Sequence, residues 1–375
     1  MIRFQSVTKR YPDGTVAVDA LDLVAPSGKI TTIVGPSGCG KTTTLRMVNR
    51  MVTPTSGQIF LDDQDTASVP AAQLRRGIGY VIQNAGLFPH RTVLDNVTTV
   101  PRLLGWSKQQ ARTRGLELLE RVGLPTELAK RYPTQLSGGQ QQRIGVARAL
   151  AADPPVMLMD EPFSAVDPIV RAQLQDEFLR LQDELDKTIL FVTHDIDEAI
   201  KLGDQVTVLR VGGKLAQVAP PHEVLTRPAD DFVADFVGRD RGYRALGFTH
   251  PETRLPLQNE PTVHLGDPVS AAAERAGDGW VLVLDEQEHP SGWLATTSLN
   301  GHDHIGADVL HRSGTVAHTD DTLRAVLDAA LSSPSGRGVL VDADGQFTGT
   351  VTGDVVLAAI DEERRADIGD PGVVR

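Results

Sequence analysis

A glycine-rich segment near the N-terminus constrains this chain more than any other feature. Gly35-Pro36-Ser37-Gly38-Cys39-Gly40-Lys41-Thr42 fits the pattern G-x-x-x-x-G-K-[ST]. It follows a β-branched run, Thr31–Val34, and leads into a segment of helical character, Thr42–Met51. In this strand–loop–helix setting the pattern predicts a phosphate-binding loop, and a plain glycine turn with a surface lysine is the weaker alternative.

Each residue type in this loop suits an anion. Glycines let successive backbone N–H groups point inward, and the following helix adds its N-terminal dipole. Lys41 brings a positive charge toward the β- and γ-phosphates, and the Thr42 hydroxyl is a hard oxygen ligand for Mg²⁺. The residues predicted to contact the phosphates are Gly35, Pro36, Ser37, Gly38, Cys39, Gly40, Lys41, Thr42 and Thr43.

A second segment supplies acids. Val156–Met159 is apolar throughout, as in a buried strand, and is followed by Asp160 and Glu161. Two carboxylates at the end of a buried parallel strand are costly unless a cation or a reaction uses them. We expect Asp160 to hold Mg²⁺ through water and Glu161 to polarise the attacking water. An acid pair alone is a weak signal, but beside a phosphate loop it becomes a strong one.

Further apolar runs extend this pattern. Ile189–Val192 and Val206–Leu209 are strand candidates, and Ile169–Leu185 has helical spacing with a polar face. Strands that alternate with helices predict an α/β domain with a largely parallel sheet.

Charge divides the chain of 375 residues, a length that predicts two or three domains. Residues 1–239 hold 27 basic and 27 acidic side chains, whereas residues 240–375 hold 10 Arg, no Lys and 22 acidic side chains. The change predicts a domain boundary near residue 240. An acidic tail also argues against nucleic acid and anionic lipid as its ligands.

Cys39 is the only cysteine, which excludes an intramolecular disulfide and fits a cytosolic location. A redox role for its thiol is less favoured than a simple backbone contact with phosphate. No apolar run approaches the roughly 18 residues of a transmembrane helix. Any membrane role is therefore expected to depend on a partner.

The tail shows a repeated pattern after a proline-rich stretch, Pro251–Pro261. The first unit holds a predicted helix, Val269–Ala276, and a predicted strand, Trp280–Leu284. The second is better preserved, with a helix, two strands and a closing helix at Leu323–Leu331, Gly338–Val341, Thr348–Thr352 and from Asp354 onward. This predicts a tandem repeat of about 50 residues per unit.

One motif points to a family. Leu136-Ser137-Gly138-Gly139-Gln140-Gln141-Gln142-Arg143 closely resembles the signature motif of ABC ATPases, which is far more specific than a phosphate loop. The other landmarks of that family follow in order over roughly residues 1–238. They are an adenine-stacking aromatic, a Q-loop glutamine, a D-loop and a switch histidine, matched by Tyr11, Gln83, Ser164-Ala165-Val166-Asp167 and His194.

The resemblance implies a fold and a site. The fold is α/β: a P-loop ATPase domain with a RecA-like parallel sheet core, an antiparallel β subdomain and a helical subdomain. The cofactors are ATP and Mg²⁺. Catalytic roles fall on Glu161, His194 and Gln83, and the metal ligands are Thr42, Gln83 and Asp160. Further nucleotide contacts are implied for Tyr11, Ser137, Gly138, Gly139, Gln140 and Asp167.

Simpler alternatives stand beside two of these roles. An aromatic residue near the N-terminus often only packs, and a lone histidine is usually structural, although His194 follows a buried strand. The segment after Gln83 receives a coupling helix of the membrane subunit in this family, so Leu87 and Phe88 are candidate contacts. The alternative places both in the core of their own domain.

The resemblance also implies partners. In the family the signature motif of one subunit closes on the phosphate loop of another, so a homodimer is the simplest assembly. Phe232–Arg241 looks like the junction in ATPase subunits of glycine betaine, carnitine and choline importers. The second tail unit resembles a CBS module, and the first is a degenerate copy. The implied domains are an ATPase at 1–238, a linker at 239–261 and CBS units at 262–310 and 311–375.

The implied function is an ATP-hydrolysing subunit at the cytoplasmic face of the membrane. It would power uptake of a quaternary amine through integral membrane permease subunits, supplied by an extracytoplasmic substrate-binding protein. The CBS pair would regulate it with a nucleotide as a candidate ligand, or serve only for dimerisation. In the tail, His302-Asp303-His304 could bind metal, but a solvated loop is favoured.

Three other functions compete. One is an importer motor for another cargo, such as an amino acid, a thiol betaine or a polyamine. A non-transport ABC ATPase is disfavoured because no long coiled-coil insertion is evident and the tail is acidic. A CBS-based nucleotide sensor without hydrolysis conflicts with an intact Glu161 and His194.

Overall fold

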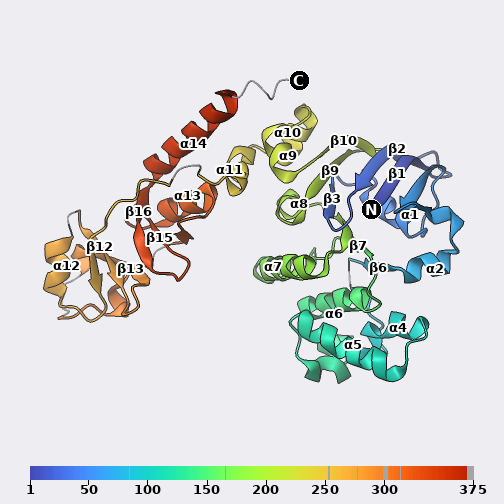
Figure 1. Ribbon diagram of the computed structural model, residues 1–375, viewed down its shortest axis with the longest axis horizontal. Coiled ribbons are helices and arrows are strands. Elements are labelled where there is room, and N and C mark those ends of the chain that lie inside the picture. The colour runs from blue at the N-terminus through green and yellow to red at the C-terminus, as the bar shows by residue number, and fades with distance from the viewer. Residues whose placement is uncertain are drawn as a thin grey trace. The chain divides into compact units, whose positions relative to one another are not determined.

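The computed structural model describes residues 1–83, 85–164, 166–251, 254–276, 278–298, 303–312 and 314–369 (Figure 1). Contacts divide the chain into two compact units, Met1–Arg239 and Asp240–Arg375. The division falls where the charge balance changes. Of the landmarks named above, Ala165 and His302 lie outside the described residues.

A six-stranded sheet forms the centre of the first unit, in the order β10-β9-β3-β8-β7-β6. All neighbouring strands are parallel except β10 and β9. Every residue of β3, β7 and β8 is buried, as expected for strands covered on both faces. The predicted parallel sheet is confirmed, with bounds β3 Ile30–Val34, β6 Ile78–Val81, β7 Val156–Asp160, β8 Thr188–Val192, β9 Gln205–Arg210 and β10 Lys214–Ala219.

An antiparallel sheet of four strands lies beside α1, in the order β2-β1-β4-β5. Its strands are β1 Ile2–Arg10, β2 Val16–Ala25, β4 Ser56–Leu61 and β5 Gln64–Asp65. Phe4 of β1, Leu45 of α1 and Leu158 of β7 belong to one buried cluster, so this sheet shares a core with the central sheet. The expected antiparallel subdomain is present.

Helices make up the rest of the first unit. Their bounds are α1 Lys41–Val48, α2 Ala71–Arg76, α3 Val93–Val97, α4 Thr99–Leu103, α5 Lys108–Arg121, α6 Gly138–Leu150, α7 Pro168–Leu185, α8 Ile196–Leu202, α9 Pro221–Thr226 and α10 Asp231–Val237. Short 3-10 turns are η1 Thr66–Ser68, η2 Thr126–Lys130 and η3 Pro133–Gln135. Helices α4, α5 and α6 gather at one end, as Figure 1 shows, and form the expected helical subdomain.

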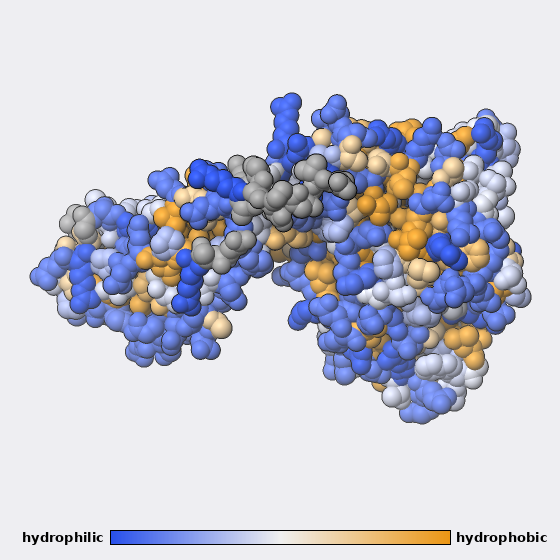
Figure 2. Space-filling model, turned by 45° about the horizontal axis from the view of Figure 1, so that its top comes forward, coloured by the Kyte–Doolittle hydropathy of each residue, from blue (hydrophilic) through white to orange (hydrophobic). Residues whose placement is uncertain are grey.

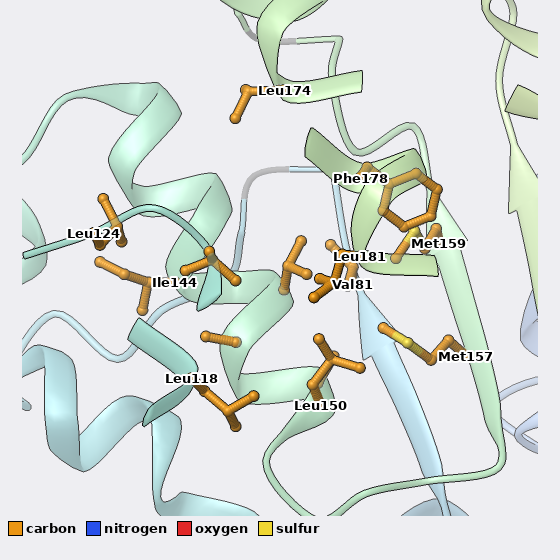
Figure 3. Close-up of a cluster of buried hydrophobic side chains, with 14 of the residues drawn as sticks. Val81, Leu118, Leu124, Ile144, Leu150, Met157, Met159, Leu174, Phe178 and Leu181 are labelled. Atoms are coloured by element: carbon orange, nitrogen blue, oxygen red, sulfur yellow. The ribbon is translucent and has the colours of Figure 1, made fainter. Parts of the chain in front are cut away.

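A large apolar cluster fixes these helices to the sheet. Figure 3 shows Leu118 of α5, Ile144 of α6 and Phe178 of α7 facing the strand residues Val81 and Met157. All are buried. Helix α6, which carries the signature motif, is therefore held against the same strands that position the acids.

Helix α1 is shorter than predicted. It ends at Val48 instead of Met51 because Arg50 takes a left-handed conformation, with φ of 54°. The N–H groups of Met51 and Val52 then both donate to the Arg46 carbonyl, at 3.0 and 3.1 Å. A left-handed residue after the last turn is a common way to end a helix.

The hydropathy of the surface and of the helices tests the prediction that the chain has no transmembrane helix. Figure 2 shows a face on which hydrophilic residues predominate and hydrophobic residues form separate patches. Within the described ranges, no helix combines the length and apolar character that crossing a bilayer requires. This agrees with the expectation drawn from the sequence.

The second unit holds two sheets of three strands each, β11-β12-β13 and β14-β15-β16. The strands are β11 Thr262–His264, β12 Trp280–Leu284, β13 Pro290–Ala295, β14 Val316–His318, β15 Arg337–Val341 and β16 Phe347–Thr352. The helices and 3-10 turns are α11 Arg241–Ala245, η4 Leu246–Phe248, α12 Val269–Arg275, η5 Thr296–Ser298, η6 Ala307–Val309, α13 Leu323–Ser332 and α14 Gly353–Gly369. The predicted strands and helices of the tail are all found.

The two halves of this unit repeat one another. In each, a parallel strand pair is followed by an antiparallel pair, with a bulge between Val283 and Leu284 in one and between Leu340 and Val341 in the other. Each first strand ends at a histidine whose N–H donates to an aspartate three residues later, at 2.9 and 2.7 Å. The structure thus has an internal repeat, while its assignment as a CBS pair stays a prediction.

The segment predicted as a linker contains ordered structure. Residues 241–248 form α11 and η4, and Gln258 forms two backbone hydrogen bonds with Thr350, at 2.8 and 3.0 Å. Tyr243, Leu246 and Leu257 pack on the apolar cluster of the second half. This part of the chain therefore packs against β16 and α13 instead of running free between domains.

Arg337 joins the two halves of the second unit. Its guanidinium lies over the Trp293 ring at 4.9 Å, its Nε lies 2.9 Å from Glu260 Oε2, and it also pairs with Asp278. The Arg337 side chain is 14 % exposed and that of Glu260 is 7 % exposed. Beside this ion pair Trp293 packs with Val339, so the sheets share an apolar contact as well.

Candidate nucleotide-binding site

The predicted site residues meet at the carboxyl ends of three neighbouring strands. The glycine loop follows β3, the two acids end β7, and Thr193-His194 follows β8. Ligands in open parallel sheets bind at this edge. The fold therefore brings together segments that are more than a hundred residues apart in the sequence.

The glycine loop leaves the start of α1 open. Gly40 precedes the helix with φ of 91° and provides no side-chain cap. A Cβ at Gly40 would lie 2.0 Å from the Ala17 carbonyl oxygen, so a larger residue would displace the loop. Lys41 Nζ donates to the carbonyls of Gly35 and Pro36, at 2.7 and 3.1 Å. The first N–H groups of α1 thus stay available to an anion.

A cavity of about 560 Å³ lies over the loop. It is lined by the loop and α1 on one side and by Glu161 and His194 on the other, the full set being Ala17, Ser37, Gly38, Cys39, Gly40, Lys41, Thr42, Thr43, Glu161 and His194. This size falls within the roughly 300–1,000 Å³ of small-molecule pockets. Its one basic side chain, free amide groups and hydroxyls fit a phosphorylated nucleotide.

Two predicted metal ligands touch each other. Thr42 Oγ1 donates to Asp160 Oδ1 at 2.9 Å, and Arg46 lies 3.9 Å from the other carboxylate oxygen. Burial raises the pKa of Asp160. Among the described residues no three His, Cys, Asp or Glu side chains form a metal cluster. A hydroxyl with one carboxylate fits Mg²⁺, which usually takes few protein ligands and completes its shell with phosphate and water.

Glu161 is held at the centre of the site. Its Oε2 lies 2.9 Å from His194 Nδ1 and accepts a hydrogen bond from Gln83 Nε2 at 3.4 Å. Its backbone is left-handed, with φ of 47°, and its N–H donates to the Val192 carbonyl at 2.9 Å. Such strain in a residue other than glycine persists where the surroundings enforce it, often at functional sites. Of the three residues predicted to be catalytic, Gln83 and His194 therefore both contact Glu161.

Three residues of the site were not predicted. Ala17 lines the cavity, and Arg46 approaches Asp160 and lies near Tyr80, whose pKa is raised by burial. Arg46 lies one helical turn after Thr42, on the same face of α1. That spacing was visible in the sequence and could have identified Arg46, whereas Tyr80 comes close only through the pairing of β6 with β7.

The comparisons with known proteins agree with this geometry. Residues 18–164 match the ABC transporter family. The osmoprotectant import ATP-binding protein OsmV of Salmonella typhimurium is 42 % identical over 95 % of each chain. The chain belongs to this family of ABC transporter ATP-binding proteins. The choline transport ATP-binding protein OpuBA of Bacillus subtilis is 52 % identical over 94 % of each chain.

Solved structures match the first unit of this ABC protein. An ATP-binding cassette solved as a dimer in a post-hydrolysis state with ADP and Pi is 34 % identical, with a TM-score of 0.54. It aligns with 59 % of this chain over 99 % of its own length. The cbiO1 protein of Clostridium perfringens is 28 % identical, with a TM-score of 0.56. The alignment covers 61 % of this chain and 91 % of cbiO1. The predicted ABC ATPase fold and family are confirmed.

Several predicted contacts of the ABC cassette lie away from the cavity. Ser137 caps α6 by accepting from the Gln140 N–H at 3.3 Å, while Gln140 Oε1 accepts from the Ser137 N–H at 3.0 Å. Asp167 caps α7 in the same manner, through the Val170 N–H. The predicted nucleotide contacts that do not line the cavity of their own chain are Tyr11, Gly35, Pro36, Ser137, Gly138, Gly139, Gln140 and Asp167, and the predicted metal ligands Gln83 and Asp160 do not line it either.

Cys39 is buried in the loop of the ABC cassette, and burial raises the pKa of its thiol. Lys41 Nζ, 3.8 Å from the sulfur, offsets this only in part. We expect alkylation of Cys39 by iodoacetamide at pH 7.5 to be at least about tenfold slower in the native chain than in urea, because reaction requires an accessible thiolate. Mass spectrometry of timed samples measures it, and equal rates would contradict the buried thiol.

Proposed function

We propose that this chain is the ATP-hydrolysing subunit of an importer for a quaternary amine osmoprotectant of the glycine betaine, carnitine, choline or proline betaine type. The observation that carries the motor role is the contact of Glu161 with both His194 and Gln83 beside the glycine loop. The cargo class rests on relatives named for osmoprotectant, carnitine and choline transport that align along almost the whole chain.

The residues divide the work of phosphoryl transfer, which is mostly positioning and charge neutralisation. Lys41 and the free amides of α1 would hold the β- and γ-phosphates. Thr42, Asp160 and Gln83 would hold Mg²⁺, which supplies positive charge to the phosphates. Glu161 would accept the proton of the attacking water, and His194 would orient that water and contact the γ-phosphate.

A second copy of the chain would complete the site. Ser137 and Asp167 are exposed, and so is Gly138 at the start of α6. A helix N-terminus with an exposed serine hydroxyl that still has its proton to donate suits a γ-phosphate presented by another subunit. Relatives solved as dimers support this arrangement. Tyr11 would stack on adenine, a contact typically worth about 1–3 kcal/mol.

The permease would dock near Phe88. Phe88 is 40 % exposed and lines a cavity of about 640 Å³ with Tyr132 and Leu103, whereas Leu87 packs on the core cluster of its own domain. We therefore assign the contact to Phe88 and a core role to Leu87. Docking would place the subunit at the cytoplasmic face of the membrane, with an extracytoplasmic substrate-binding protein delivering cargo.

The second unit would regulate transport as a CBS pair. Its internal repeat of strand, helix and two strands fits that module, and its acidic composition disfavours nucleic acid and anionic lipid as ligands. A nucleotide is the candidate ligand. The alternative is a module used only for dimerisation. In that case ATP turnover would not respond to other nucleotides added as ligands of the second unit.

Uptake of labelled glycine betaine tests the proposal. Cells that carry the parental chain should show uptake that rises with osmolarity, and cells with E161Q should lose that increase. Immunoblots control for expression, and a strain without other betaine carriers removes background. Unchanged uptake in the E161Q cells would reject the glycine betaine assignment. Parallel uptake of an amino acid and a polyamine then distinguishes the alternative cargoes.

A further inference from the structure

A buried carboxyl group lies one turn after His194 and has no part in the proposed reaction. Glu198 of α8 is only 5 % exposed, and acids are rarely buried without partners. Its Oε1 accepts a hydrogen bond from Gln175 Nε2 of α7 at 3.1 Å, and Gln175 is itself 7 % exposed. The Glu198 N–H donates to Asp195 Oδ1 at 3.3 Å, and burial raises the pKa of the Glu198 carboxyl group.

Helix α7 meets the start of α8 at two points. Arg171 and Gln175 are four residues apart and share one face of α7. Arg171 lies 3.8 Å from Asp195 Oδ2, and Gln175 binds Glu198. Arg171 also donates to the Val166 carbonyl at 3.0 Å, just before α7 begins. These contacts join the segment that ends at Asp167 to the loop that carries His194.

Both neighbours of His194 are fixed by this network. Thr193 is 1 % exposed, accepts a hydrogen bond from the Asp195 N–H at 3.0 Å, and donates its own N–H to the Ile33 carbonyl at 3.2 Å. The His194 side chain, in contrast, is 63 % exposed. Little packing holds the imidazole ring itself, so its distance to Glu161 depends on the backbone on either side.

We propose that Glu198 is a positioning residue that keeps His194 within reach of Glu161, by binding Gln175 and so docking the start of α8 against α7. The proposal rests on the proposed roles of Glu161 and His194 in hydrolysis. Glu198 acts on His194 through the backbone at the start of α8, so its loss affects turnover more than nucleotide binding. It also links the D-loop segment to the histidine, because α7 carries both Arg171 and Gln175.

The test compares two alanine variants of the full chain. In E198A, kcat for ATP with Mg²⁺ should fall by about 10–100-fold, the usual effect of a misplaced reacting group, while KM changes by less than about twofold. Q182A is the matched control. Like Gln175, Gln182 is a buried side chain of α7, but its amide donates to the carbonyls of Gly28 and Lys187 and not to Glu198. Its kcat should stay parental.

Further measurements keep the outcomes distinct. E198Q should restore kcat to within about threefold, because the amide oxygen of the new glutamine can still accept from Gln175 Nε2. The imidazole NMR signal of His194, identified by its loss in H194A, should shift in E198A and not in Q182A. If E198A does not fold, Gln175→Leu replaces it, with a similar loss of kcat expected.

Parental kcat in folded E198A or Gln175→Leu, with H194A inactive, would overturn the positioning role and leave the proposed function standing. Equal losses in E198A and Q182A would overturn it as well, because they would indicate a general structural effect. Parental kcat in H194A would instead reject the proposed role of His194 in hydrolysis.

Discussion

Replacing Glu161 by glutamine should cut ATP turnover by about 10²–10⁴-fold, the usual contribution of a general base. The amide keeps the size of the side chain and retains an oxygen that can accept from His194 and Gln83. It cannot take a proton from water. Binding of ATP should therefore persist, and a dimer with trapped ATP should accumulate.

Turnover assays and light scattering with ATP and Mg²⁺ measure both effects. E117Q is the matched control, since Glu117 is a half-buried acid of α5 that pairs with Arg114 and Arg121. Its turnover should equal the parental value. Parental turnover in E161Q would mean that another group accepts the proton, and the catalytic assignment would then be wrong.

Replacing Arg337 by alanine should destabilise the second unit by about 3–5 kcal/mol, the range for breaking one partner of a buried ion pair. Glu260 would be left buried without its cation, and the Trp293 ring would lose its contact with the guanidinium. Hydrogen exchange of β12 and β15 in increasing urea measures the loss within the full chain.

R324A controls for simple loss of an arginine. Arg324 is exposed on α13 and lies 3.9 Å from Asp328, and surface pairs of this kind contribute about 0–1 kcal/mol. Equal losses in R324A and R337A would show that Arg337 does not link the two halves.

E260Q should lower the free energy of unfolding of the second unit by less than R337A does. Burial raises the pKa of Glu260, so the fold favours its neutral form. The contribution of Glu260 to the free energy of unfolding is fully present below the ordinary pKa of glutamate. It is lost as the pH rises through the raised pKa of Glu260 in the folded chain. Glutamine is neutral at every pH, so E260Q should flatten this part of the pH dependence of unfolding. Urea titrations between pH 4 and pH 7 provide the comparison.

Local chemistry made part of this structure predictable. The glycine loop and the acids after β7 are contiguous in the sequence, and their residue types have few other uses together. Four strands of the central sheet, β3, β7, β8 and β9, were predicted within one or two residues because buried parallel strands are continuous apolar runs, whereas β6 and β10 were not predicted.

Contacts between distant segments were not predictable. Tyr80 joins Arg46 only because β6 pairs with β7, and Gln175 reaches Glu198 only because α7 packs on α8. The prolines between 251 and 261 correctly indicated irregular backbone. They carry no information about where Tyr243 or Leu257 would pack, and that is why the segment was expected to be a linker.

The matched bulges of the second unit have a consequence for its ancestry. In both halves one strand of the antiparallel pair carries an extra residue at the same step, Ser291 opposite Val283 and Leu284 and Thr348 opposite Leu340 and Val341, an irregularity that two unrelated segments would rarely share. The match is what duplication of a single segment would produce. Because Arg337 of the second half lies over Trp293 and pairs with Asp278 of the first, a substitution on either side of this contact alters the surroundings of the other half.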